Sequence, residues 1–177
     1  MATTYFQKIA FTLACLVAAT GALAANPGYV VVSRNLDRWW LPAPHHSKIP
    51  PKYPLFARKH GVAGCVAVAY AIDRNGQVTD AHIWRERLSD LQERKEVEQA
   101  ALHAISQWRF VPASGNTAHK PVYTYIIDTF SLRNRRWSPE RQQIERRRLR
   151  DQCSIPNFVQ QVHAAGTLPA KRTSNQS

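Results

Sequence analysis

The stretch Gly64-Cys-Val-Ala-Val-Ala-Tyr-Ala-Ile-Asp-Arg-Asn-Gly76 decides the fold of this chain. Large apolar residues alternate with small ones from residue 64 to residue 72, and this period of two predicts a β-strand. Because the small residues are apolar as well, we expect the strand to lie in the middle of a sheet, where neither face meets water. Asn75-Gly76 stands between this run and a second apolar run, which predicts a hairpin turn over residues 73–76.

Two further strands are expected after this turn. The first covers residues 77–85, and its broken alternation between Val78 and Ala81 indicates a bulge or a twist. The second covers residues 121–132, which are rich in β-branched and aromatic side chains. The sequence therefore predicts a small sheet whose first strand is its centre.

Helices are expected before, between and after these strands along the sequence. A short one is predicted over residues 53–61, and apolar residues at helical spacing predict a longer one from Arg94 that Pro112 ends. After the last strand, Ser138-Pro139 is typical of a helix start, and this helix is expected to continue to Arg150. A last short helical piece is expected between Phe158 and Gly166. The fold class is therefore α+β.

The positive charge of the chain is concentrated near its carboxy terminus. The 177 residues carry a net charge of +12 with a pI of about 10.2, and eight arginines lie between residues 133 and 150 against two glutamates. Such a cluster indicates either an anionic envelope lipid or polysaccharide as a partner, or a solvated helix face. The residues expected to form an anion-binding patch are Arg141, Arg146, Arg147, Arg148 and Arg150.

The amino terminus has the pattern of an export signal. Lys8 precedes an apolar run, and Ala22-Leu23-Ala24 supplies the small residues of a cleavage site, so residues 1–24 are predicted to be a signal peptide of a periplasmic protein. The alternative is an uncleaved segment that anchors the protein in the inner membrane, facing the periplasm. Export argues against a nucleic-acid partner. The proline-rich residues 25–50 are expected to form a tether, in which residues 29–33 are a candidate short strand and Trp39-Trp40-Leu41 is expected to pack on the domain.

No catalytic residue, metal ligand set or cofactor motif is recognisable. His45-His46 lacks a third ligand at a suitable spacing, and no nucleophile has a base at a recognisable distance in the sequence. The sequence therefore predicts a protein that is not an enzyme and that needs no metal and no cofactor.

The two cysteines of the mature chain are predicted to form a disulfide. Cys65, Ala67, Ala69 and Ala71 share one face of the central strand, and that face is too apolar to meet water. Residues 137–162 are the only unassigned segment with apolar residues to cover it, and they contain Cys153. Disulfides persist in exported proteins, so we expect a Cys65–Cys153 bond. Two buried free thiols are the alternative.

Four sequence elements resemble the TonB carboxy-terminal domain family, and together they span residues 51–132. The Trp-Arg-Phe-x-Pro element, with an Ala-Ala-Leu before it, is the most specific of them. The elements are Tyr53-Pro54, the alternating run from Gly64 to Val78, the segment Ala100-Ala101-Leu102 to Trp108-Arg109-Phe110-x-Pro112, and the strand from Pro121-Val122 to Phe130-x-Leu132.

This resemblance implies a three-stranded antiparallel sheet with two helices on one face. Residues 133–177 lie outside the family pattern, and their sequence predicts a basic helical extension and a disordered tail. It also implies that the domain works in the periplasm of Gram-negative bacteria. There it would bind an extended segment of an outer-membrane transporter, or of another envelope protein, as an added strand beside its last strand. The residues implied for this binding edge are Val122, Tyr123, Thr124, Tyr125, Ile126, Ile127 and Phe130.

The chain also departs from a complete energy transducer of this family. Residues 9–25 contain no histidine, whereas the membrane helix of such a transducer carries one, and residues 25–50 are too short for its periplasmic spacer. We therefore expect a non-catalytic periplasmic interaction module. The alternatives are a membrane-anchored energy transducer and an envelope-surface binder that acts through its arginine-rich tail.

Overall fold

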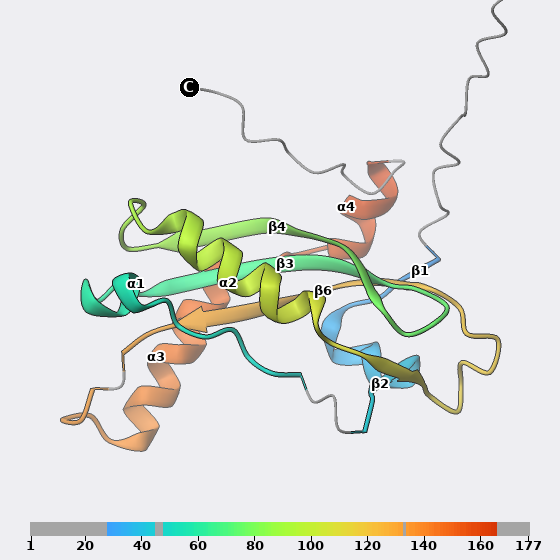
Figure 1. Ribbon diagram of the computed structural model, residues 1–177, viewed down its shortest axis with the longest axis horizontal. Helices are drawn as coiled ribbons and strands as arrows, with labels where there is room; N and C mark the ends of the chain where they lie inside the picture. The colour runs from blue at the N-terminus through green and yellow to red at the C-terminus, as the bar shows by residue number, and fades with distance from the viewer. Residues whose placement is uncertain (1–27, 45–47, 133, 166–177) are drawn as a thin grey trace, which may run out of the picture.

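Figure 1 shows the computed structural model, in which residues 28–44, 48–132 and 134–165 are described. The predicted signal peptide, His45-His46, Arg133 and the predicted disordered tail lie outside the described residues. Among the helices of the described ranges, none is both long enough and apolar enough to cross a membrane.

The main sheet has four strands in the order β1-β6-β3-β4. Strand β3 (Gly64–Ile72) lies between β4 (Val78–Leu88) and β6 (Val122–Phe130) and is antiparallel to both. All nine residues of β3 are buried, so the predicted central strand is confirmed. The expected three-stranded antiparallel sheet is wrong in one respect, because β1 (Tyr29–Val30) adds a fourth strand parallel to the start of β6.

The β3–β4 hairpin is closed by the side chain of Asp73. Its Oδ1 atom accepts hydrogen bonds from the N–H groups of Asn75 and Gln77, both at 2.8 Å. Gly76 has a φ of 75°, and a Cβ atom there would lie 2.0 Å from the carbonyl oxygen of Phe110, so only glycine fits. The register of β4 against β3 shifts twice, which confirms the predicted bulge and adds a second one near Trp84.

One face of the sheet is covered by α1 (Leu55–Lys59) and α2 (Arg94–Ser106). The even-numbered side chains of β3 pack there against Val97, Ala101 and Ile105 of α2, with Trp108 behind them. Helix α2 ends at Ser106, before the expected end at Pro112. The reason is that β5 (Phe110–Pro112) pairs with β2 (Trp40–Pro42) in a separate two-stranded sheet.

The segment predicted as a tether is folded where the structure describes it. Strand β1, a short 3-10 helix (Ser33–Arg38, labelled η1) and β2 lie in it, and Leu36 and Trp40 are buried in the core beside α2. The indole N–H of Trp40 donates to the carbonyl oxygen of Lys120 at 3.1 Å. These contacts attach residues 28–44 to the domain, so the tether expected from their proline content is wrong for this part. The candidate strand at residues 29–33 and the packing of Trp39 and Trp40 on the domain are confirmed.

The opposite face of the sheet is covered by α3 (Pro139–Gln152) and α4 (Phe158–Ala164), which lie behind the sheet in Figure 1. The small residues of β3 contact Ile155, Phe158 and Val162 there. Cys65 and Cys153 are joined by the predicted disulfide, with 6.0 Å between their Cα atoms. The side chain of Ser138 accepts a hydrogen bond from the N–H of Arg141 and caps α3, as its sequence indicates.

Candidate partner-binding edge

Strand β6 presents main-chain groups to solvent beyond the point where β1 ends. The N–H groups of Tyr29 and Val31 donate to the carbonyl oxygens of Pro121 and Tyr123, so the odd-numbered residues of β6 direct their N–H and C=O groups toward β1. The register of β6 against β3 has no shift, so this alternation continues along the strand. Tyr125, Ile127 and Thr129 therefore direct their main-chain groups outward.

These outward groups are free within the part of the chain that the structure describes. After Val31 the chain turns away into η1, where the N–H of Asn35 donates to the carbonyl oxygen of Val32 at 2.9 Å. No hydrogen bond joins the outward main-chain groups of residues 125–129 to any described residue. A row of unpaired N–H and C=O groups is a template for an additional strand. We call residues 125–129 the free edge.

The free edge is shorter than the predicted one. Val122 and Tyr123 are covered by β1, and the main-chain groups of the even-numbered residues Thr124 and Ile126 point to β3. The side chains of Val122 and Phe130 are buried beside α2, whereas those of Tyr123, Tyr125 and Ile127 pack against the carboxy-terminal extension. Contact with a partner would therefore come mainly from the main chain of two of the named residues, Tyr125 and Ile127, and from that of Thr129, which lies between them and Phe130 on the same strand.

The other outer strand of the sheet is a poorer template. Strand β4 has a bulge at each of its two register shifts, and Asp80 has a φ of 50°. Bulges interrupt the regular spacing of donors and acceptors and protect an edge from pairing. The regular edge of β6 is therefore the better candidate for strand addition.

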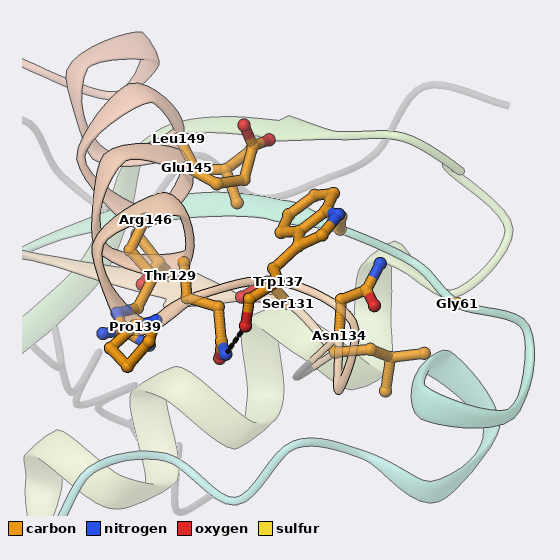
Figure 2. Close-up of a pocket in the computed structure, with 12 residues that line it drawn as sticks. Gly61, Thr129, Ser131, Asn134, Trp137, Pro139, Glu145, Arg146 and Leu149 are labelled. Carbon is orange, nitrogen blue, oxygen red and sulfur yellow. Dashed lines mark hydrogen bonds between the residues drawn. The ribbon is translucent and has the colours of Figure 1, made fainter.

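Two hollows lie beside the free edge. One, of about 900 Å3, is bounded by Val32–Arg34, by Tyr125–Asp128 and by Arg150 with the chain from Ile155 to Gln160. The other, of about 650 Å3, lies at the end of β6 and is shown in Figure 2. It is lined by Thr129 and Ser131 on one side and by α3 and the loop before it on the other. Side chains of an added strand could enter both hollows.

Asp128 is a carboxylate at this edge that lacks a hydrogen-bond partner. Its Oδ2 atom is buried and accepts no hydrogen bond from the described residues. Burial raises the pKa of the Asp128 carboxyl to about 6, and the positive charge of Arg150 offsets part of this effect. Asp128 lies opposite Val66 in the register, so it belongs to the face that α2 covers.

The structure does not gather the arginines of α3 into a single patch. Arg148 forms an ion pair with Glu145 at 2.9 Å, and the guanidinium of Arg141 lies 4.9 Å from the centre of the Trp137 ring. Arg146 and Arg150 line the two hollows beside the free edge, and Arg147 is exposed and lines neither. Sequence reasoning predicted these arginines as one surface, whereas the helix divides them among different neighbours.

These features define a small α+β domain with one sheet edge open for pairing. Residues 49–132 match the model of the family described as Gram-negative bacterial TonB protein C-terminal. Over these residues the chain is similar to this family, which agrees with the resemblance of its sequence elements.

Known relatives resemble part of the chain. Protein TonB of Vibrio cholerae is 32% identical over 71 residues, which are 40% of this chain and 27% of that protein. The chain thus matches about a quarter of the length of this relative. The solution structure of the Pseudomonas aeruginosa TonB carboxy-terminal domain is 23% identical, with a TM-score of 0.44, and the match covers 60% of this chain and 97% of that one. The solution structure of the Helicobacter pylori TonB carboxy-terminal domain is 28% identical, with a TM-score of 0.37. That match covers 48% of this chain and 71% of the other.

Proposed function

We propose that this protein is a non-catalytic, TonB-like interaction module of envelope transport, which binds an extended segment of an envelope protein by strand addition. The outward main-chain groups of Tyr125, Ile127 and Thr129 carry this proposal. Pairing with an extended peptide would satisfy them, and the affinity would come mainly from main-chain hydrogen bonds. A periplasm-exposed segment of an outer-membrane transporter is the partner that the family indicates.

We place the protein in the periplasm. The export pattern of residues 1–24 supports this location, and so does the Cys65–Cys153 disulfide, because such bonds persist in oxidising compartments. The proposed partner, a periplasm-exposed segment of an outer-membrane transporter, lies in the same compartment. Location and proposed partner therefore agree.

Proline at the free edge tests strand addition directly. In Ile127→Pro the outward N–H is lost, whereas the main-chain bonds of β6 to β3 do not use that group. We expect this variant to lose binding to peptides from periplasm-exposed segments of outer-membrane transporters of the same bacterium, measured by fluorescence anisotropy. Circular dichroism should show the wild-type fold.

The matched control is Ile127→Ala, which removes the same side chain and keeps the N–H. We expect it to bind within about threefold of the wild type, because main-chain pairing dominates the contact. Equal binding by the wild type and a folded Ile127→Pro variant would contradict strand addition at this edge.

A further inference from the structure

The carboxy-terminal extension forms one side of the binding edge, although it lies outside the family match. Arg146 and Arg150 are four residues apart in α3 and therefore lie on the same side of the helix. Arg146 lines the hollow at Thr129 that Figure 2 shows, and Arg150 lines the hollow at Tyr125 and Ile127. The two guanidinium groups thus follow the free edge from one end to the other.

Both arginines are available to a partner. They are exposed, and neither forms an ion pair with any residue that the structure describes. Arg148, in contrast, is held by Glu145 through two hydrogen bonds of 2.9 and 3.1 Å. The guanidinium groups of Arg146 and Arg150 are therefore not occupied by an ion pair within the described part of the chain.

The geometry of a sheet directs the side chains of an added strand toward these arginines. Residues directly opposite each other on neighbouring strands project to the same face. The side chains of Tyr125 and Ile127 pack on the face that the extension covers, so partner residues opposite them, and opposite Thr129, project to that face too. Successive positions of this kind are every second residue of the partner segment.

The charges that surround these positions favour acidic side chains. The hollow at Tyr125 is lined by two positive residues, Arg34 and Arg150, and by one negative residue, Asp128. Asp128 belongs to the other face of the sheet. The hollow at Thr129 contains Arg146 against Glu145, and Arg148 already neutralises Glu145. Each hollow therefore has an excess of positive charge where a partner side chain would enter.

We propose that α3 is a specificity element that selects partner segments with acidic side chains at alternate positions, which pair with Arg146 and Arg150. This inference rests on the proposed strand addition at the free edge. Planar guanidinium groups bind carboxylates through paired N–H donors, which adds orientation to the attraction between the charges. The extension would then discriminate among strands that the main chain alone accepts equally.

The test compares two labelled peptides of alternating valine and threonine. In one peptide, two alternate positions in the middle are glutamate, and in the other they are glutamine. We expect the full-length mature protein to bind the glutamate peptide about three- to tenfold more tightly at low salt, as partly exposed ion pairs allow. The preference should decrease as the salt concentration rises.

Two double variants assign this preference to particular arginines. Arg146→Gln/Arg150→Gln should bind both peptides equally, with little change for the glutamine peptide. Arg136→Gln/Arg147→Gln is the matched control, because it removes two exposed charges that line neither hollow. It should keep the preference for glutamate.

The outcomes separate this inference from the proposed function. If the wild type binds both peptides equally and Ile127→Pro abolishes binding, strand addition stands and the selection of acidic segments is overturned. A loss of preference in the control variant as large as in Arg146→Gln/Arg150→Gln also overturns it, since the effect would then be one of net charge. If neither peptide binds the wild type, the proposed function fails and the inference fails with it.

Discussion

Removal of the Cys65–Cys153 disulfide should strongly destabilise the protein. The bond joins residues 88 positions apart in the sequence. In the chain-entropy model, a closed loop of this length lowers the entropy of the unfolded chain. The folded state is thereby stabilised by about 4.6 kcal/mol relative to the unfolded chain. Both cysteines are completely buried among apolar side chains, so alanine replaces them without exposing a polar group. We therefore expect Cys65→Ala/Cys153→Ala to fold, but with a much smaller free energy of unfolding.

Urea unfolding monitored by tryptophan fluorescence measures this effect. For a slope of about 2 kcal/mol per molar, the predicted loss moves the unfolding midpoint by about 2 M. Each protein is measured with and without an excess of reductant. The wild type should lose most of its advantage in reductant, whereas the double variant should not respond, which separates the covalent link from the change of side chains.

Two results would refute this reasoning. A wild-type midpoint that reductant shifts by less than about 0.5 M would mean that the bond contributes little stability. Alkylation of two cysteines in the unreduced mature protein, detected by mass spectrometry, would mean that the bond is absent.

Two other predictions concern single side chains. Phe158 is 1% exposed and contacts three aromatic rings of the sheet, so Phe158→Ala should lower the free energy of unfolding by about 3–5 kcal/mol in urea, whereas Ile144→Ala, at a position 66% exposed, should change it by less than about 0.5 kcal/mol. Burial raises the pKa of Asp128 to about 6 from its usual 3.8, so the folded protein holds this proton more tightly than the unfolded chain does. The stability that results is present below about pH 4 and is lost as the pH rises through 6. Asp128→Asn should therefore have a larger free energy of unfolding than the wild type near pH 7, by up to about 3 kcal/mol, measured in urea. An equal pH dependence of the free energy of unfolding for both proteins would contradict this.

The sequence predicts the centre of the fold because the period of two in β3 determines both of its faces. Large residues on one face require a helical cover, and α2 provides it. Small apolar residues on the other face require a second cover, and only the segment with Cys153 has the apolar residues to form it. The predicted disulfide rests on this pattern, because it assigns both cysteines to one covered face, and the structure confirms the bond.

The same periodicity cannot reveal the shortest strands. Tyr29–Val30 and Phe110–Pro112 are too short to show a period, and the spacing of Trp108 also fits the preceding helix. Their pairing depends on partners far away in the sequence, such as Trp40–Pro42 for β5. For that reason the sequence overestimated both the length of α2 and the length of the free edge, which β1 shortens at its start.

The geometry of the candidate site depends on the disulfide as well as on the sheet. Cys65 is the register partner of Thr129 on β6, and Cys153 ends α3 one helical turn after Arg150. The bond therefore attaches the end of α3 beneath the strand next to the free edge. Without it, the two arginines would be held beside the hollows by the packing of Leu149, Ile155 and the side chains of α4, and by the hydrogen bond from Arg85 to the carbonyl oxygen of Ser154. The covalent link that stabilises the fold thus also determines where the positive charges of α3 meet an incoming strand.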